Sequence, residues 1–408
     1  MARTQLPPQI RKLTITDRKT GRAIVRYEVR VDTGSRTTTR KNPDGTTTQI
    51  VNRTQSKRRF PTEQAARQAL AETTNKVSNG TFIHSSELTL AHACERWLDS
   101  KHKLKESSLR GHRVNLQPVI SEIGGIPVQK LSKTDIDSLV KKLRAGGLAL
   151  PNGRARKPWS ARTVNYMLSL LTAILDDQLK QGSIIRNVAA MVDRLPTEAA
   201  EMETLSQLEA KRLLKYVDRD PMAHAWHLAL SGLRRGEIAG LRWSDVDFKK
   251  NTVSIANSRV AVGSRIVEGT PKSRRSKRRL PLPKPLAAAL KAAKAQQAED
   301  KLLLGVDYTD SIYVVRLPSG EAVHPNLLTF RWKKVLKAAG LKSIRLHDAR
   351  HTCATLMHLQ GVPIAVIAAW LGHASAAFTL SVYAHSQEDA LLEAANSFDP
   401  LQKRRKST

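Results

Sequence analysis

Two periodicities of apolar residues alternate along this chain and divide it into parts. Residues 23–33 and 46–60, AIVRYEVRVDT and TTTQIVNRTQSKRRF, are rich in Val, Ile and Thr, which predicts two strands. The segment between them, GSRTTTRKNPDG, ends in Asn-Pro-Asp-Gly turn chemistry. A helical pattern begins after Thr62, an expected N-cap, and stops near Gly80. Residues 1–85 therefore predict a small sheet covered by one helix.

From residue 86 the apolar residues recur at helical spacing. Val164, Met167, Leu168 and Leu171 form one stripe of a long helix that starts after Ser160. The same spacing is found in residues 89–101, 107–124 and 132–147. A four-helix domain is therefore expected over residues 86–186, followed by a linker over residues 187–203.

Residues 204–390 mix both patterns and predict a third domain. Thr204 opens a capped helix, and two more helices are expected on either side of Gly232. Strand-prone runs then interrupt the helices at residues 252–263, 264–283 and 310–315. Helical spacing resumes at Pro325, and residues 391–408 form a basic tail. The expected fold class is multidomain and mainly α, with a small β-sheet in the first domain and another in the third.

The net charge of the chain indicates what kind of partner it binds. The 408 residues carry 68 Lys and Arg against 36 Asp and Glu, a net charge of +32. Such an excess destabilises a compact chain by self-repulsion unless a polyanion shares the field, so nucleic acid is the expected partner. An anionic membrane surface is the competing interpretation.

Membrane insertion and secretion are not expected. No apolar run reaches the roughly 18 residues of a membrane span, and the N-terminus MARTQLPPQIRKLTITDRK lacks the apolar core of a signal peptide. Cys94 and Cys353 lie far apart in the sequence and are expected to be reduced core residues rather than a disulfide or a metal pair.

Basic residues near the N-terminus are candidates for DNA binding. Residues 1–85 contain 17 Lys and Arg against 6 Asp and Glu. A β-ribbon fits the major groove of DNA, although a merely solvated basic surface is the alternative. The candidates in this domain are Arg30, Lys57, Arg58 and Arg59. In the four-helix domain, candidates near helix starts or on polar faces are Arg110, Arg113, Arg162 and Asn165, because backbone N–H groups at helix starts also favour phosphate.

The third domain contains residues suited to phosphate chemistry. When a phosphodiester is broken, charge builds on its non-bridging oxygens, and bidentate guanidinium groups match that charge. Arg234 lies in SGLRRGE, with Glu237 three residues on and able to hold the guanidinium in place. His347 and Arg350 lie at i and i+3 in LHDARHT, so both can address one phosphate. His373 follows in LGHAS.

Cleavage also needs a nucleophile and an acid for the leaving oxygen. A tyrosine forms a phosphotyrosyl ester that preserves the bond energy for a second transfer, and Tyr383 is the candidate. Lys272, in the basic turn GTPKSRRSKRRLPLP, is the candidate general acid, with Lys277 as an alternative. We expect no ATP, cofactor or metal. His347 and His351 have the spacing of two helical metal ligands, but no Asp or Glu is suitably placed as a third.

Four motifs, SGLRRGE, LHDARHT, LGHAS and TLSVYAH, resemble the Arg, His-x-x-Arg, Leu-Gly-His and Tyr boxes of the tyrosine recombinase (phage integrase) family, in order and at family spacing. Residues 1–85 resemble an arm-type DNA-binding domain, and residues 86–186 resemble a helical core-binding domain. Two departures are mild: Ser231 stands where Thr is usual, and Ala349 where a larger apolar residue is common.

The resemblance implies a site-specific recombinase that integrates a phage or mobile element into a host chromosome. By the same resemblance, Arg234, Arg350 and His373 clamp the scissile phosphate and His347 assists. Lys272 would protonate the departing 5′ oxygen, and Tyr383 would form a 3′-phosphotyrosyl link. The implied partners are double-stranded DNA with core and arm attachment sites, a homotetramer on that DNA, a host DNA-bending factor and an excisionase. The expected location is the cytoplasm, at the bacterial nucleoid.

Two other functions remain as alternatives. A type IB topoisomerase uses a similar set of residues but needs no arm domain, so the basic N-terminal domain disfavours it. A catalytically inactive DNA-binding regulator is disfavoured because all six candidate residues are present.

Overall fold

The computed structural model describes residues 6–17, 21–41, 47–79, 82–83, 85–197, 202–269 and 277–373. The chain divides into two compact units, residues 1–198 and 199–408, each of which is described by itself. The first unit holds two hydrophobic cores, and the second holds one large core with a small satellite. The fold is mainly helical with small sheets, as predicted.

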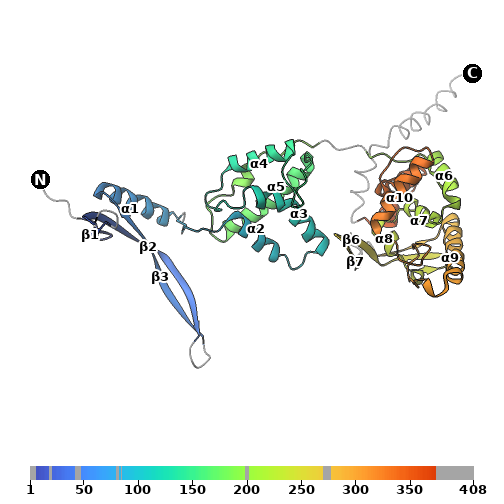
Figure 1. Cartoon of the computed structure of the whole chain (residues 1–408), viewed down its shortest axis with the longest axis horizontal. Coiled ribbons are helices and arrows are strands. Elements are labelled where there is room, and N and C mark those ends of the chain that lie inside the picture. Colours follow the sequence, from blue (N-terminus) through green and yellow to red (C-terminus); the bar gives the residue numbers. More distant parts are fainter. Residues whose placement is uncertain are drawn as a thin grey trace, which may run out of the picture. The chain divides into compact units, whose positions relative to one another are not determined.

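A three-stranded antiparallel sheet with the order β1-β2-β3 begins the first unit (Figure 1). Its elements are β1 (Ile10–Thr16), β2 (Ala23–Lys41) and β3 (Thr47–Phe60), followed by α1 (Glu63–Ser78). Ile10, Val29 and Ala66 are buried where α1 packs on the sheet. Thr62 caps α1, as predicted, because its side chain accepts a hydrogen bond from the backbone of Ala65.

Two details of this sheet differ from the prediction. β1 was not predicted, and β2 continues to Lys41, so most of the expected connecting segment GSRTTTRKNPDG is strand. The run of threonines explains the extension, because β-branched residues favour extended backbone. Only residues 42–45 of that connection lie outside the described residues.

The second core of the first unit belongs to four α-helices, as predicted. They are α2 (Leu90–Asp99), α3 (Glu106–Glu122), α4 (Lys133–Ala145) and α5 (Ala161–Lys180), followed by the 3-10 helix η1 (Val188–Met191). Ser132 and Ser160 cap α4 and α5 through their side chains. The stripe of α5 that contains Val164 and Leu171 is fully buried and contacts the other three helices.

The start of the predicted linker packs into this core. Val188 and Val192 are buried in it, and Leu195 packs against it. Asn187 caps η1 and donates to the carbonyl of Thr172 on α5. The linker expected over residues 187–203 is therefore tied to the helices over its first half, because its apolar residues complete their core.

The second unit surrounds its sheets with helices. Its helices are α6 (Gln207–Tyr216), η2 (Val217–Arg219), α7 (Ala223–Leu230), α8 (Arg235–Gly240), η3 (Trp243–Asp245), α9 (Lys284–Leu304), η5 (Gly305–Asp307), α10 (Pro325–Ala338), α11 (Leu346–Leu359) and α12 (Ile364–Leu371). Gly232, with a φ of +90°, separates α7 from α8, as predicted. No helix among the described residues is long and apolar enough to cross a membrane.

Two small sheets accompany these helices. Their strands are β4 (Val246–Asp247), β5 (Thr252–Ile255) and β8 (Arg278–Pro281) in one sheet, and β6 (Ser258–Val262) and β7 (Arg265–Gly269) in the other. The β6–β7 hairpin packs closely on α8, because a Cβ at Gly240 would lie 2.9 Å from the backbone nitrogen of Arg259. The segment between β7 and β8 holds Lys272, and residues 270–276 lie outside the described residues.

Two predictions for this unit were wrong. Residues 310–315 form no strand and make one isolated bridge, between Tyr313 and Arg242. Their apolar character serves burial, because Val314 and Val315 lie in the main core. Helix α9 was not predicted, although it follows directly after the third strand-prone run.

Candidate active site

Arg234 stands at the N-terminal boundary of α8 and is fixed there by Glu237. Its backbone N–H donates to Glu237 Oε2 at 3.0 Å, and its Nη1 donates to Oε1 at 2.8 Å. Its Nη2 donates to the carbonyl oxygen of Gly372 at 3.1 Å. The i,i+3 pairing expected from the sequence is therefore present. The side chain remains 35% exposed, so it is open to a ligand on one side.

Arg350 is held from inside the unit. It lies on α11 and is 1% exposed. Its Nη1 donates to the carbonyl oxygen of Gly232 at 2.6 Å, and its Nη2 donates to that of Leu371. Because Gly232 is two residues before Arg234, this contact ties the two arginines into one frame.

The C-terminal end of α12 completes this frame. Gly372 adopts the left-handed conformation that commonly ends a helix, and the backbone N–H of His373 donates to the carbonyl of Ala368 at 2.9 Å. The last carbonyls of a helix lack intrahelical partners and carry the negative end of its dipole. Three consecutive carbonyls here, the carbonyl triplet of residues 370–372, accept from three arginines: Arg278 donates to Trp370, Arg350 to Leu371 and Arg234 to Gly372.

Three histidines lie near these arginines. Burial, followed by the charge of Arg350, lowers the pKa of His373 to about 4. Burial and the neighbouring ring of His347, whose centroid is 5.0 Å away, lower the pKa of His351 to about 4. Desolvation and Arg350 also lower the pKa of His347. At neutral pH the rings are therefore uncharged, and each offers one N–H donor and one acceptor.

Arg278 is a component of this frame that we did not predict. Its side chain is 6% exposed and shares Glu237 with Arg234, with Nη2 3.0 Å from Glu237 Oε2. Burial would raise the pKa of Glu237, but the hydrogen bonds and charges of Arg278 and Arg234 outweigh it and lower that pKa. Strand alternation was the available signal, because Arg278 shares a strand face with the buried Leu280.

The remaining predicted catalytic residues are Lys272 and Tyr383, and both lie outside the described residues. Their roles stay predictions. Lys277, the alternative acid, is exposed next to the start of β8. Burial raises the pKa of the Cys353 thiol to about 12, which agrees with its expected place as a core residue on α11.

The N-terminal sheet separates the four predicted DNA-binding residues between its two faces. Val29, on the face that α1 covers, pairs with Arg58, so Arg58 lies on that face. Lys57 and Arg59 alternate to the open face, where Lys57 pairs with Arg30. The open face also carries Arg11 and Arg26 by the same register. The buried carboxylate of Glu28 accepts from Arg30 Nε at 2.6 Å and from Arg59 Nε at 3.1 Å.

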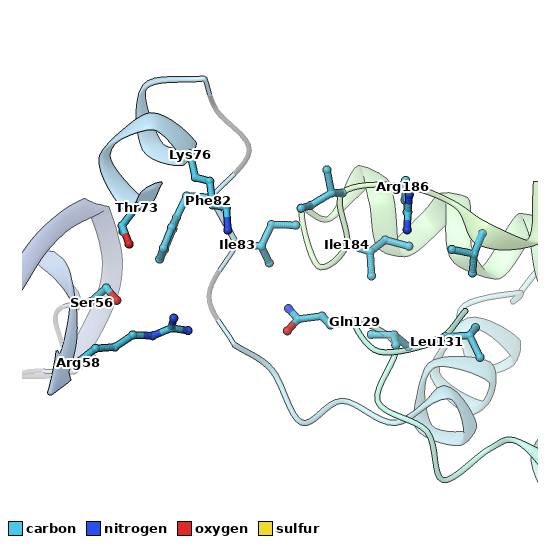
Figure 2. Close-up of a pocket in the computed structure, with 13 residues that line it drawn as sticks. Ser56, Arg58, Thr73, Lys76, Phe82, Ile83, Gln129, Leu131, Ile184 and Arg186 are labelled. Atoms are coloured by element: carbon cyan, nitrogen blue, oxygen red, sulfur yellow. The ribbon is translucent and has the colours of Figure 1, made fainter. Parts of the chain in front are cut away.

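Arg58 instead lines a cavity of about 520 Å³ within the first unit (Figure 2). Lys76 of α1 lines the same cavity, together with Phe82, Gln129 and Ile184. This cavity contains none of the predicted catalytic residues. Arg58 therefore lies on the face opposite to Arg30, Lys57 and Arg59, because neighbouring residues of a strand point to opposite faces, and its role in DNA binding stays a prediction.

The helical part presents three of its four predicted DNA-binding residues to solvent. Arg110 and Arg113 are exposed on α3, and Arg162 is exposed in the first turn of α5. Asn165 differs, because its amide donates to the carbonyl of Leu195 at 2.8 Å and accepts from the backbone N–H of Leu195 at 2.9 Å. Its role in this structure is to hold the segment after η1.

Two arginines and two neutral imidazoles in one frame suit a reaction in which a phosphoryl group is transferred from one oxygen to another. The site therefore has the composition of a phosphoryl-transfer centre. Residues 203–390 match the model of the Phage integrase family. These residues therefore form a Phage integrase domain, and relatives of the chain are named tyrosine recombinase and integrase.

Relatives extend the similarity beyond the matched residues. A tyrosine recombinase XerC-like protein from Caldanaerobacter subterraneus is 26% identical, covering 79% of this chain and 86% of its own length. The ICEBs1 integrase of Bacillus subtilis is 27% identical, covering 67% of this chain and 72% of its own length. The Tn1549 transposon integrase in complex with circular intermediate DNA shares the fold, with a TM-score of 0.62 and 16% identity over 76% of this chain and 99% of the solved chain.

Proposed function

We propose that this chain recombines DNA by cutting one strand at a time through a covalent 3′-phosphotyrosyl link to Tyr383. The tyrosine oxygen attacks the scissile phosphorus and forms the new P–O bond, while the bond to the 5′ oxygen breaks. The phenol gives its proton to solvent, the departing 5′ oxygen gains one from Lys272, and solvent returns a proton to Lys272, so that no net proton is gained or lost. Because the ester keeps the phosphodiester bond energy, a 5′ hydroxyl of a second strand attacks it and releases the tyrosine without ATP.

The observation that carries this proposal is the shared frame of Arg234 and Arg350. Both guanidinium groups are anchored on one side, to Glu237, Gly232 and the carbonyl triplet. Anchored donors need no reorganisation when charge develops on the non-bridging oxygens, which makes them effective in the transition state. His373 and His347 donate as neutral imidazoles to the same phosphate.

The test of this proposal uses Tyr383→Phe. The substrate is a nicked duplex that carries the core site, identified by sequencing the junctions that the protein leaves on plasmids with candidate sites. We expect the wild type to form a covalent protein–DNA adduct on a denaturing gel. Tyr383→Phe should form none and still bind the duplex, because only the nucleophile is lost. An adduct that persists in Tyr383→Phe would refute the assignment.

Tyr308→Phe is the matched control. The Tyr308 hydroxyl is buried in the second unit and has no hydrogen-bond partner among the described residues. Its loss removes no hydrogen bond among the described residues, so this variant should form the adduct at the wild-type rate. A defect as complete as that of Tyr383→Phe would show that the assay reports folding rather than the nucleophile.

The open face of the N-terminal sheet is proposed to bind arm-type DNA sites. It carries Arg30, Lys57 and Arg59 at the register given above, and β-strands can enter the major groove of DNA. Lys57→Ala should reduce the slope of log affinity against log salt by about 0.9, the contribution of one phosphate contact. Arg67→Ala, on α1, is the control that should leave the slope unchanged. Equal slopes for all three proteins would contradict the proposal.

The assembly on DNA belongs to the same proposal. We expect Arg110, Arg113 and Arg162 to contact the core site, and four protomers to bring two core sites together at the bacterial chromosome. A host DNA-bending factor and an excisionase would set the direction of the reaction. The stoichiometry is tested by sedimentation of the protein with core-site duplexes, either alone or joined to arm sites. A dimer as the largest active complex would contradict the proposed tetramer.

A further inference from the structure

Arg278 links three segments of the second unit that are distant in sequence. It lies on β8, and its Nη1 and Nη2 are 3.3 and 3.0 Å from the two carboxylate oxygens of Glu237 on α8. Its Nε donates to the carbonyl of Trp370 on α12 at 2.6 Å. One planar guanidinium therefore holds α8, β8 and α12 at a single point.

Glu237 depends on this contact for its charge balance. Its carboxylate is 2% exposed and is shared between Arg278, which is almost fully buried, and Arg234, which is partly open. If Arg278 were absent, Arg234 would be the sole remaining cation among these three residues. Its guanidinium would then be drawn to Glu237 and away from a phosphate, because a buried carboxylate is costly to leave unpaired.

The carbonyl triplet depends on it as well. Arg278 binds Trp370, the first of the three carbonyls, and the other two orient Arg350 and Arg234. The indole N–H of Trp370 in turn donates to the carbonyl of Ser231 at 2.9 Å. Arg278 thus fixes the helix end from which His373 follows.

We propose that Arg278 is a positioning residue for the phosphate clamp, which consists of Arg234, Arg350 and His373. It acts on Arg234 through Glu237 and on the other two residues through the carbonyl triplet. This inference rests on the proposed function, because it assigns Arg278 to the same site. Arg278 touches no reacting atom in this scheme. It sets where the guanidinium groups point when the phosphate is bound.

The test compares variants of the full chain on two nicked core-site duplexes. One duplex carries the natural scissile phosphate, and the other carries a methylphosphonate at that position. The methylphosphonate has one unit less negative charge, so it depends less on aimed guanidinium groups. The measured quantity is the single-turnover rate constant of adduct formation at saturating protein, with DNA affinity and the melting temperature measured in parallel.

Arg278→Met removes the charge and keeps an unbranched side chain. We expect its rate constant on the natural phosphate to fall by about 10²-fold, the usual scale for a misplaced catalytic group. On the methylphosphonate, the rate constant of Arg278→Met should be less than about 10-fold below that of the wild type, because the guanidinium groups have less negative charge to match. On the natural phosphate, the rate constant of Arg278→Lys should lie between those of the wild type and Arg278→Met. An ammonium can pair with Glu237 but lacks the planar fork that also reaches the carbonyl of Trp370.

Arg316→Met is the matched control. Arg316 is also a buried arginine of the second unit, 7% exposed in its side chain, and it pairs with Asp300 at 2.8 Å rather than with a clamp residue. Its loss should lower the melting temperature and leave the rate constants on both duplexes unchanged at temperatures where the protein is folded.

Three results would overturn the inference. They are an unchanged rate for Arg278→Met, an equal loss on both duplexes, or a loss that Arg316→Met reproduces. The proposed function fails separately, through absence of an adduct with the wild type on the natural phosphate. The inference concerns the ratio of variant to wild type on each duplex, so the two failures are distinguishable.

Discussion

The guanidinium of Arg350 donates to the carbonyl oxygen of Gly232 at 2.6 Å, across 118 residues of sequence. A second bond joins it to the carbonyl of Leu371. A guanidinium has five N–H groups in a fixed plane, so some of them can anchor the side chain while others bind a ligand. Arg350 is therefore part of the framework of the second unit as well as a proposed phosphate ligand.

Arg350→Lys should separate the anchoring of this side chain and its proposed phosphate binding from its positive charge. An ammonium keeps the charge but cannot hold two carbonyls and a phosphate in one plane. We expect adduct formation on the nicked core-site duplex to slow by about 10²- to 10³-fold, as when one preorganised donor is lost. DNA affinity, measured by gel shift, should change little because the proposed DNA contacts involve many other cations. An adduct rate near that of the wild type would contradict the geometry described here.

Gly232→Ala should damage the same frame from the opposite side. A Cβ at this position would lie 2.7 Å from Leu371 Cδ2 and 3.3 Å from Cys353 Sγ, and the φ of +90° is unfavourable for alanine. Backbone strain alone costs about 1–3 kcal/mol of unfolding free energy. Chemical denaturation followed by the fluorescence of the buried Trp226 and Trp332 measures the loss.

Gly361→Ala is the control for Gly232→Ala. Gly361 has a φ of +74°, but a Cβ there meets no atom within 4 Å. It should lose stability through backbone strain and keep the wild-type rate of adduct formation. If both variants lost activity equally, crowding against Leu371 would not be the cause.

The general acid is tested by Lys272→Ala and Lys277→Ala. A positioned acid contributes about 10²- to 10⁴-fold, so Lys272→Ala should slow adduct formation by that factor and leave DNA binding intact. A duplex with sulfur in place of the departing 5′ oxygen should restore the rate, because a thiolate leaves without a proton. Rescue of Lys277→Ala instead would transfer the role to Lys277.

Acid should destabilise the second unit through its buried histidines. Burial lowers the pKa of both His224 and His351 to about 4. Their unfolded forms take up a proton near 6.5, so between these values the unfolded state binds more protons. Stability is therefore fully present above pH 6.5 and declines as the pH falls toward 4, by at most about 1.4 kcal/mol per pH unit for each histidine.

Denaturation at pH 7.5 and at pH 5.5 checks this expectation. Among the described residues, His224 Nε2 has no hydrogen-bond partner, so His224→Gln is a direct probe of one of the two groups. The variant should lose less stability than the wild type between the two pH values. An equal loss in both proteins would assign the effect to other groups.

The parts of the site that the sequence predicted are those with local spacing. Arg234 and Glu237 lie three residues apart at the start of one helix, and His347 and Arg350 lie three apart on another. Helical periodicity determines such neighbours without knowledge of the fold. The family motifs then indicated which of these pairs belong together.

Contacts between distant segments could not be obtained in this way. Arg278 meets Glu237 across 41 residues and Trp370 across 92, and nothing in the run SKRRLPLP distinguishes it from the basic residues beside it except strand alternation. Asn165 bonds to Leu195 across 30 residues of sequence, and the spacing of residues around Asn165 does not indicate this contact. The face of β3 on which Arg58 lies is decided by its pairing with Val29, which the sequence pattern does not reveal.

The carbonyl triplet also bears on when the protein becomes able to cut DNA during its synthesis. Arg234 and Arg350 are translated before residues 370–372, yet each is oriented by a carbonyl of that segment. A nascent chain that ends before Trp370 therefore contains both arginines but has no clamp. We therefore expect strand cleavage only after the ribosome has completed almost the whole second unit, and we expect an interrupted translation product that binds DNA to leave it unbroken.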